Sequence, residues 1–210
     1  MGELPARIVA ATSSAHKLAE LRGVAEGYGV RIVSPKDVAA ELGLEALGEI
    51  AEHGESFDEN AEIKARAVFD WCGLPAIGDD SGLEVEALGG RPGIYSARYA
   101  GPGASDADRI AKLLSELEKL EAGGEVVSRA ARFWCSLCLV LPAGGCYRAH
   151  GELRGEVLRV PRGSDGFGYD PIIHLFDLNA TLAEVEFSVT CSRGFRAKAA
   201  HALLGQFAKR

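Results

Sequence analysis

Long apolar runs are missing from this 210-residue chain, and none approaches the roughly 20 residues that a membrane-spanning helix needs. We therefore expect no membrane association. The stretch from Met1 to Ala11 lacks the apolar core and the small-residue cleavage site of a secretory signal, which predicts a cytoplasmic location. Positive charge is also scarce, because 23 Lys and Arg residues face 30 Asp and Glu residues, a net charge of -7. This balance argues against a nucleic-acid-binding surface, although a local pocket for a small anion remains compatible with it.

The number and the positions of the cysteines indicate the redox compartment and the role of these residues. The five cysteines are an odd number in a chain without a secretory signal, which favours free thiols in a reducing compartment. Cys135 and Cys138 form a CxxC pair, but they stand in the apolar run from Arg132 to Leu141, which has the pattern of a strand. A three-residue offset points them to opposite faces of such a strand. We therefore interpret both as buried structural cysteines.

The order of predicted elements is that of an α/β protein. The chain opens with a strand, a polar break, a helix and a second strand, at Ile8 to Ala11, Thr12 to Ser14, Lys17 to Glu26 and Val30 to Val33. Pro35 to Leu44 is a short helix or a loop. Later helices are predicted from Ser56 to Phe69, Ser105 to Glu121 and Arg193 to Ala208, and later strands at Leu74 to Ile77, Leu83 to Val85, Ala130 to Leu141 and Cys146 to Leu153. Residues 142–145 join the last two strands with a hairpin signal.

The composition and the lack of repeats or low-complexity linkers favour a single folded domain. Apolar residues make up 47% of the chain and charged residues 25%, which is ordinary for a folded protein. The length suffices for one core or for one domain in two lobes. We predict one domain over residues 1–210, with a two-lobed mixed sheet, flanking helices and a central substrate cleft. Ligands favour such sites outside strand carboxyl ends.

Two adjacent carboxylates, Asp79 and Asp80, follow the predicted strand from Leu74 to Ile77, and Ser81 and Gly82 come next. Like charges at the buried end of a strand are costly to desolvate unless a cation or a cluster of donors lies beside them. Mg²⁺ usually binds through one or two carboxylates plus substrate phosphates, so the pair indicates a magnesium site. The alternative is a polar turn capped by Asp and Ser.

A second polar cluster, Thr12 to Lys17, lies at a predicted strand-to-helix junction. Backbone N–H groups at a helix start favour an anion, and the side chains of Thr12, Ser13, Ser14 and Lys17 would complete a phosphate cradle. The segment does not match the Walker pattern. The alternative is that Ser14 is a simple N-cap and Lys17 lies on a solvated face.

A third cluster surrounds the start of the helix that follows Ser56. Ser56 and Glu59 have the spacing of a capping box, so we interpret Glu59 as a cap rather than a ligand. Lys64 lies further along the same helix. Its ammonium could contact a phosphate or neutralise nearby carboxylates such as Glu52.

The fourth cluster is the loop from Ser164 to Asp170, in which Gly166 and Gly168 flank Phe167. Such a loop lets the backbone approach a ligand closely while an aromatic face stacks on a base. The alternative is a tight turn around a buried Phe167. Acids for a metal, lysines and hydroxyl groups for phosphates and an aromatic glycine loop for a ring together indicate a nucleoside triphosphate.

With these motifs the chain resembles the inosine/xanthosine triphosphate pyrophosphatase family, whose members hydrolyse non-standard purine nucleoside triphosphates. The matching segments keep their order across nearly the whole chain, at Thr12 to Lys17, Ser56 to Ala61, Lys64-Ala65, Leu74 to Leu83, Leu88 to Tyr99, Gly166 to Pro171 and Ser192 to Gly194. The long match from Gly89 to Tyr99 and the two acidic motifs are highly specific together. The resemblance implies an enzyme that converts ITP, dITP and XTP to the monophosphate and pyrophosphate with Mg²⁺, typically as a homodimer.

Carried over residue by residue, the resemblance implies a role for each motif. Asp80 would bind Mg²⁺ and act as general base on the attacking water, and Glu52 would be the second metal-binding carboxylate. The triphosphate would be held by Thr12, Ser13, Ser14, Lys17 and Lys64, and Ser81 would contact the substrate. The base and sugar pocket would be lined by Phe167, Gly168, Tyr169, Asp170, Ser192 and Arg193.

Three positions depart from the family pattern. Ser14 stands where the family has Asn, and Ser192-Arg193 replaces a His-Arg pair. The family's lysine before that pair has no counterpart, because Glu184 to Cys191 is several residues short and contains no Lys. The losses of the histidine and the lysine fall on the base pocket, so they bear on purine selectivity more than on hydrolysis. A nucleotide-binding protein that has lost catalysis, a pyrophosphatase with altered base preference and a septum-inhibitor type of pyrophosphatase acting on modified pyrimidines remain as alternatives.

Overall fold

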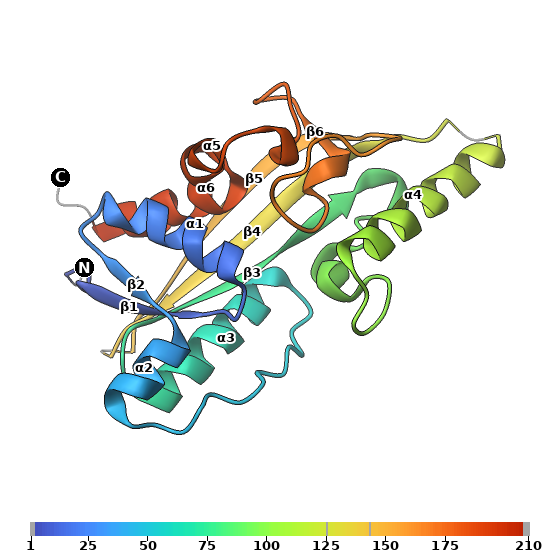
Figure 1. The fold of residues 1–210 in the computed structure, drawn as a ribbon. Coiled ribbons are helices and arrows are strands. Elements are labelled where there is room, and N and C mark those ends of the chain that lie inside the picture. Colours follow the sequence, from blue (N-terminus) through green and yellow to red (C-terminus); the bar gives the residue numbers. More distant parts are fainter. Residues whose placement is uncertain (1–2, 125, 143, 208–210) are drawn as a thin grey trace. The chain divides into compact units, whose positions relative to one another are not determined.

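The computed structural model describes residues 3–124, 126–142 and 144–207, and its strands form a six-stranded sheet in the order β2-β1-β3-β4-β5-β6 (Figure 1). The strands are β1 (Arg7–Ala11), β2 (Arg31–Val33), β3 (Ala76–Val85), β4 (Ala130–Val140), β5 (Cys146–Val157) and β6 (Ile173–Leu175). β1 runs parallel to β2 and to β3, whereas β5 and β6 are antiparallel. The predicted α/β class with a mixed sheet and flanking helices is therefore confirmed.

The α-helices lie between or after these strands in the sequence. They are α1 (Ala15–Glu26), α2 (Pro35–Leu42), α3 (Phe57–Cys72), α4 (Asp106–Ala122), α5 (Phe187–Arg193) and α6 (Phe195–Leu204). Short 3-10 helices occupy Glu86–Leu88, Gly93–Arg98, Asp170–Ile172, Leu182–Glu184 and Gly205–Phe207. In the described part of the chain, no helix has both the length and the apolar character that a bilayer crossing requires.

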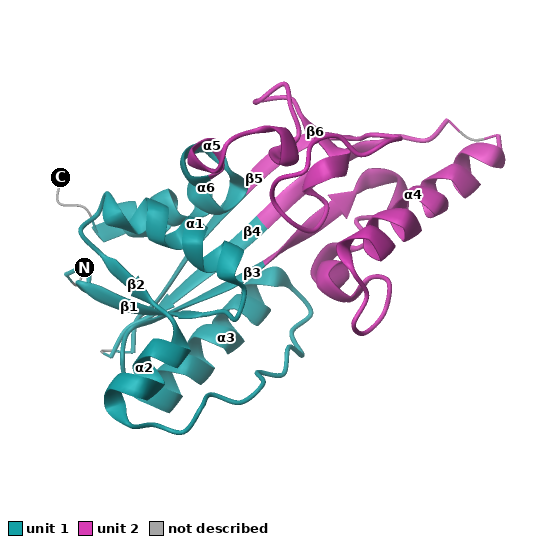
Figure 2. Cartoon of the chain, viewed as in Figure 1, with its two compact units in different colours: residues 1–80, 135–151, 191–210 teal, residues 81–134, 152–190 magenta. Residues whose placement is uncertain are grey.

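The chain divides into two compact units, coloured teal and magenta in Figure 2. Unit 1 comprises residues 1–80, 135–151 and 191–210, and unit 2 comprises residues 81–134 and 152–190. β3, β4 and β5 each contribute residues to both units. Three of the four polar clusters, at residues 12–17, 52–64 and 79–80, fall in unit 1, whereas the glycine-rich loop falls in unit 2.

In unit 1, helices cover both faces of the strands. α1 and α6 pack against each other on one face, and α2 and α3 lie on the other (Figure 1). The residues from Ile8 to Ala11 are all buried, as expected of a strand that is covered on both sides. Ser14, Ser34 and Ser56 are the N-caps of α1, α2 and α3, and each accepts a backbone hydrogen bond from the residue three positions on. Glu59 Oε2 accepts a hydrogen bond from the Glu55 N–H, so Glu59 caps the start of α3, but it does so one residue before the Ser56 N–H that the predicted capping box would use.

Small residues bring α3 close to β3. A Cβ atom built on Gly78 would lie 1.9 Å from the Ala61 carbonyl oxygen and 2.8 Å from the Ala65 backbone nitrogen. Ala61 and Ala65 are themselves fully buried. Because the helix and the strand approach so closely here, the side chain of Lys64 reaches the residues that follow Gly78 in β3, where its Nζ donates to the Asp79 carbonyl oxygen at 2.9 Å.

We expect Gly78→Ala to destabilise the folded protein by about 2 kcal/mol or more, because an added methyl group in a packed core forces backbone shifts. The measurement is the midpoint of thermal unfolding, followed by circular dichroism. Gly27→Ala is the matched control, since Gly27 has φ -63° and ψ -16° and its added Cβ would meet the Val24 carbonyl oxygen at an ordinary 3.5 Å. Equal midpoints for the two variants would contradict the role of Gly78 in packing.

Unit 2 contains α4, which the sequence predicted. Ser105 and Asp108 form a capping box at its start, so two backbone N–H groups are satisfied where the helix begins. Leu113 and Leu117 are fully buried, as expected of one apolar face on an amphipathic helix.

Two predicted boundaries are wrong. β3 continues from Ala76 to Val85, so Asp79 and Asp80 lie inside one strand instead of at its end, and the predicted break before Leu83 does not exist. The predicted closing helix is interrupted at Gly194, the N-cap of α6. Residues 143 and 208, in the predicted hairpin turn and at the predicted helix end, lie outside the described residues. Cys135 and Cys138 are buried free thiols, as predicted.

Candidate active site

Asp79 and Asp80 are consecutive residues of β3, so their side chains point to opposite faces of the sheet. One face carries α1 and α6, and the other carries α3 (Figure 1). The Asp79 carboxylate accordingly contacts Lys17 of α1 and Arg196 of α6. The Asp80 carboxylate contacts Lys64 of α3. Two like charges are tolerated inside one strand because each has cationic partners of its own.

On the α3 side, three predicted site residues come together. Lys64 Nζ lies 2.7 Å from Asp80 Oδ1 and 3.0 Å from Glu52 Oε1. Asn60 Nδ2 donates a 3.3 Å hydrogen bond to Asp80 Oδ2. The Asp80 side chain is 7% exposed and the Glu52 side chain 31% exposed, so this carboxylate cluster is buried at Asp80 and opens to solvent at Glu52.

The protonation behaviour of this cluster follows from its burial and its charges. Burial raises the pKa of Asp80 above its ordinary value, and the Lys64 ammonium opposes that rise. Burial alone would lower the pKa of Lys64, but the carboxylates of Asp80 and Glu52 outweigh it, so the pKa of Lys64 is raised. A buried carboxylate of increased basicity, held in place by an ammonium, is suited to accept a proton from a neighbouring water.

The oxygen donors of this cluster fit Mg²⁺. A single ammonium contacts both carboxylates, so Glu52 and Asp80 lie close enough to share one cation. Mg²⁺ usually takes one or two carboxylates and completes its shell with water and substrate phosphates. Among the residues that the structure describes, no group of three or more His, Cys, Asp or Glu side chains is placed to hold a metal ion.

On the opposite face, Asp79 is bound by two cations. Lys17 Nζ lies 2.6 Å from Asp79 Oδ1, and Arg196 Nε lies 2.5 Å from Asp79 Oδ2. Burial alone would raise the pKa of Asp79, but Arg196 and Lys17 outweigh it and hold that pKa far below its ordinary value. Asp79 is therefore a permanent anion that fixes the position of Lys17, and it is unsuited to accept a proton.

Sequence analysis did not identify Arg196 or its second partner, Glu20. Arg196 Nη1 donates to Glu20 Oε1 at 2.8 Å, and the two side chains are 1% and 4% exposed. One feature of the sequence could have indicated the buried ion pair. Arg196 is a charged residue in the predicted closing helix, beside Phe195 and close to several alanines. Its position on the buried face of α6 required a carboxylate partner inside the protein.

The polar break before α1 is a helix cap. Ser14 Oγ accepts a 3.4 Å hydrogen bond from the Lys17 backbone, and Thr12 Oγ1 accepts a 3.1 Å hydrogen bond from the Ser14 backbone. The N-cap interpretation of Ser14 is therefore confirmed. The alternative that Lys17 lies on a solvated face is wrong, because its side chain is 18% exposed and paired with Asp79. Ser13, beside the cap, is exposed.

The glycine-rich loop belongs to unit 2. Gly166 and Gly168 have φ of 77° and 64°, the left-handed region that glycine adopts without strain. The Phe167 N–H donates to Asp170 Oδ2 at 2.9 Å, and the Tyr169 hydroxyl donates to a backbone carbonyl oxygen at 3.1 Å. Tyr169 and Asp170 are buried and shape the loop, whereas Phe167 and Gly168 are partly exposed.

The remaining predicted residues flank these clusters in the sequence. Ser81 follows Asp80 in β3 and is half-buried. Ser192 and Arg193 end α5, and both are exposed. The short segment around Gly194 thus carries one exposed arginine, Arg193, and one buried arginine, Arg196.

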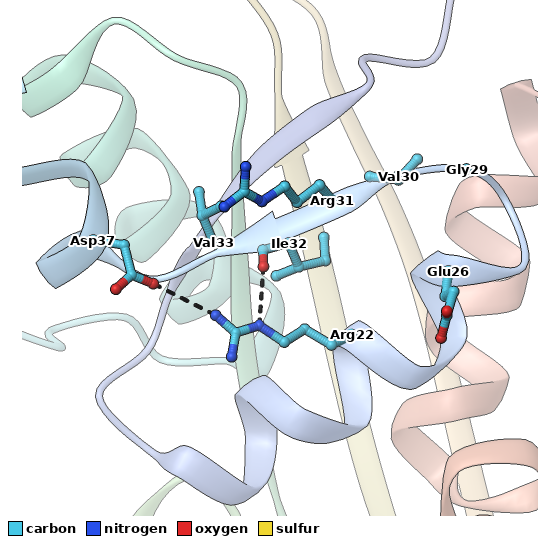
Figure 3. Close-up of a pocket in the computed structure, with 8 residues that line it drawn as sticks. All are labelled: Arg22, Glu26, Gly29, Val30, Arg31, Ile32, Val33 and Asp37. Atoms are coloured by element: carbon cyan, nitrogen blue, oxygen red, sulfur yellow. Dashed lines mark hydrogen bonds and ion pairs between the residues drawn. The ribbon is translucent and has the colours of Figure 1, made fainter. Parts of the chain in front are cut away.

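A separate hollow of about 520 Å³ lies over β2 and the end of α1 in unit 1 (Figure 3). Its lining shares no residue with the carboxylate cluster. Arg22 is already used by the protein, because its Nε donates to the Ile32 carbonyl oxygen at 3.0 Å and its Nη2 lies 3.5 Å from Asp37 Oδ2. We therefore place the candidate chemistry at the carboxylate cluster.

Comparisons with known proteins agree with one another. The model of the Ham1 family matches residues 8–206. A dITP/XTP pyrophosphatase from Geobacter sulfurreducens is 41% identical over 193 residues, which cover 92% of each chain. One from Halorhodospira halophila is 42% identical over 200 residues, which cover 94% of this chain and 95% of the other. The solved structure of a HAM1 protein from Coxiella burnetii superposes with a TM-score of 0.81 at 36% identity, covering 95% of this chain and 97% of the other.

Proposed function

This chain belongs to the Ham1 family, and from that premise we propose that it hydrolyses non-standard purine nucleoside triphosphates, such as ITP, dITP and XTP, to the monophosphate and pyrophosphate. The observation that carries this proposal is the convergence of Glu52 and Asp80 on Lys64 Nζ, at 3.0 and 2.7 Å. The relatives from Geobacter sulfurreducens and Halorhodospira halophila, named dITP/XTP pyrophosphatases, support the substrate class.

In this proposal, different side chains of unit 1 have different roles in the reaction. Asp80 accepts the proton of the attacking water, because it is buried and held in place by Lys64. Lys64 and Lys17 provide positive charge toward the phosphate oxygens. The start of α1, with Ser13 exposed beside its cap, offers backbone N–H groups to the same anion. Preorganised charges of this kind stabilise the transition state without reorganisation.

We further propose that the cation is Mg²⁺, held by Glu52 and Asp80 together with the phosphates of the substrate. When bound, it would supply positive charge that offsets the phosphate oxygens and polarises the attacking water. The two carboxylates, of which Glu52 is the more exposed, are the oxygen donors that support this assignment.

The base would be selected by hydrogen-bond polarity. A guanidinium such as that of Arg193 donates to the 6-oxo group of hypoxanthine and xanthine, whereas adenine presents a donor at that position. Sites that hydrogen-bond a substrate group reject analogues that lack it by large factors. Arg193 is exposed at the end of α5 and so is accessible to a ligand.

We expect weaker discrimination between bases than the family pattern implies, because Ser192 replaces a histidine and the lysine before it is missing. The measurement is a competition assay with inosine, xanthosine, guanosine and adenosine triphosphates. Ser192→His is expected to increase the preference for the 6-oxo, non-standard bases. Sharp discrimination by the wild-type protein, unchanged in Ser192→His, would contradict this prediction.

Release of pyrophosphate from a panel of triphosphates tests the proposed function itself. Pyrophosphate in the presence of Mg²⁺, with ITP or XTP as the best substrates, supports it. Nucleotide binding without pyrophosphate release would instead indicate a protein that has lost catalysis. A preference for modified pyrimidines would indicate the septum-inhibitor type of activity.

We also propose that the protein acts in the cytoplasm as a homodimer, as the family resemblance implies. Sedimentation of the purified protein measures the oligomeric state, and a monomer at all concentrations would overturn that part of the proposal.

A further inference from the structure

The glycine-rich loop is held in unit 2 by contacts with two other segments of the chain. The Tyr169 hydroxyl donates to the Ser96 carbonyl oxygen at 3.1 Å, and the Gly168 N–H donates to Asp106 Oδ2 at 2.7 Å. Asp106 is the first residue of α4 and lies 62 positions before Gly168 in the sequence. It has no part in the chemistry proposed above, so its contact with the loop requires an explanation of its own.

The start of α4 does not use the Asp106 carboxylate as its cap. Ser105 Oγ accepts a 3.2 Å hydrogen bond from the Asp108 backbone, and Asp108 Oδ2 accepts a 2.9 Å hydrogen bond from the Ser105 backbone. This reciprocal pair satisfies two backbone donors at the helix start. The Asp106 carboxylate is therefore available to a partner outside α4, and its Oδ2 atom accepts the hydrogen bond of the loop.

Arg109 fixes the orientation of the Asp106 carboxylate. Its Nη2 atom pairs with Asp106 Oδ1, and its Nη1 atom donates to the carbonyl oxygens of Ala97 and Ala104 at 2.7 and 2.9 Å. The Arg109 side chain is 19% exposed. Because a guanidinium is planar and presents its donors in a fixed fork, these bonds hold the carboxylate with Oδ2 directed at the loop.

We propose that Asp106, oriented by Arg109, is a positioning residue for recognition of the base, which acts by holding the Gly168 N–H and thereby the place of the neighbouring Phe167 ring. This inference rests on the proposed function, in which the loop contacts the base. The Phe167 N–H is bonded within the loop to Asp170, whereas the Gly168 N–H is bonded to a separate element. A loop that is ordered before the ligand arrives loses less conformational entropy on binding.

Asp106→Ala is expected to raise KM for inosine triphosphate by about fivefold or more, because the half-buried Gly168 N–H loses a charged acceptor and the loop must then be ordered by the ligand. We expect kcat to stay nearly unchanged, since Asp80 belongs to unit 1 and contacts none of these residues. Inorganic triphosphate with Mg²⁺ is the probe without a base. Its affinity, measured by titration calorimetry, is expected to equal that of the wild-type protein.

Asp108→Ala is the matched control. Asp106 and Asp108 both lie in the first turn of α4, where a carboxylate stabilises the helix through its dipole. The Asp108 carboxylate bonds to Ser105 at the start of the same helix. Its removal is expected to lower the thermal unfolding midpoint at least as much as Asp106→Ala does, and to leave KM for inosine triphosphate unchanged.

Asp106→Asn is a second variant that preserves the size of the side chain. Its single oxygen faces two donors, the Arg109 guanidinium and the Gly168 N–H. The charged donor makes the stronger hydrogen bond, so the Gly168 N–H is left against the amide nitrogen. We therefore expect KM for inosine triphosphate to rise here as well, again with unchanged affinity for inorganic triphosphate.

A merely structural Asp106 would give a different pattern. Wild-type KM in folded Asp106→Ala, an equal rise in Asp108→Ala, or an equal loss of affinity for inorganic triphosphate would each overturn the inference. If Asp106→Ala does not fold, Asp106→Asn decides by the same measurements.

The proposed function and the inference can fail separately. If the wild-type protein releases no pyrophosphate but binds inosine triphosphate more tightly than Asp106→Ala does in calorimetry, the proposed function fails and the inference stands. If the wild-type protein releases pyrophosphate and the variants at Asp106 and Asp108 behave alike, the inference fails alone. A wild-type protein that binds no inosine nucleotide would overturn both.

Discussion

Asp80→Asn is expected to lower the rate of triphosphate hydrolysis by about a thousandfold or more, because it removes the proton acceptor and one of two metal-binding carboxylates. The substitution keeps the size of the side chain, and the amide oxygen can still accept a hydrogen bond from Lys64, which lies 2.7 Å from Asp80 Oδ1. The fold is therefore preserved. The measurement is kcat for pyrophosphate release, together with the thermal unfolding midpoint.

Asp70→Asn is the matched control for this prediction. Asp70 lies on α3, like Lys64, but it is exposed near the C-terminal end of the helix. Its substitution is expected to leave kcat unchanged. Near-normal turnover by folded Asp80→Asn would refute the role of Asp80 as general base.

Removal of divalent cations is expected to abolish pyrophosphate release, and added Mg²⁺ is expected to restore it. Glu52→Gln is expected to raise the Mg²⁺ concentration for half-maximal activity by about tenfold or more, because one negative charge is lost beside the ion. Saturating Mg²⁺ should recover much of the activity, since Asp80 and the substrate phosphates still bind the ion. This recovery separates a metal ligand from a general base.

Glu49→Gln provides the control for Glu52, because Glu49 is exposed in the same segment before α3. It is expected to leave the Mg²⁺ requirement unchanged. An unchanged requirement in Glu52→Gln, or full activity after chelation, would contradict the assignment of the metal to this carboxylate cluster.

Two members of the carboxylate cluster, Asp80 and Lys64, stand in patterns that the sequence shows, whereas Glu52 was assigned only through the family resemblance. Asp79 and Asp80 interrupt an apolar strand, and Lys64 follows a helix cap at Ser56. The order of the first strand, helix and second strand was likewise readable from periodicity. These signals are local, so a single sequence carries them.

The ion pairs between distant residues could not be predicted from sequence patterns in the same way. Arg196 reaches Asp79 only because α6 packs on α1 across the face of β3, and the two residues are 117 positions apart. The continuation of β3 through both acids was missed for the same reason. The cost of desolvating two like charges predicts that the strand ends before Asp79 and Asp80. In the structure Lys17 neutralises Asp79 on one face of the strand and Lys64 neutralises Asp80 on the other, so the strand continues.

The glycine-rich loop shows a further limit of motif analysis. Its residues were grouped as a base pocket, but Asp170 accepts a backbone hydrogen bond from Phe167, and the Tyr169 hydroxyl is bonded within unit 2. A motif reports which residues occur together and does not separate those that shape a loop from those that face a ligand. Phe167 and Gly168, which are partly exposed, are the members accessible to a ligand.

The structure of a complex with Mg²⁺ and a slowly hydrolysed analogue of inosine triphosphate tests the central assignment most directly. The expected result is one cation contacted by carboxylate oxygens of Glu52 and Asp80 and by phosphate oxygens of the analogue, with a water held between Asp80 and the first phosphorus. A complex in which both carboxylates point away from the phosphate chain would contradict the account.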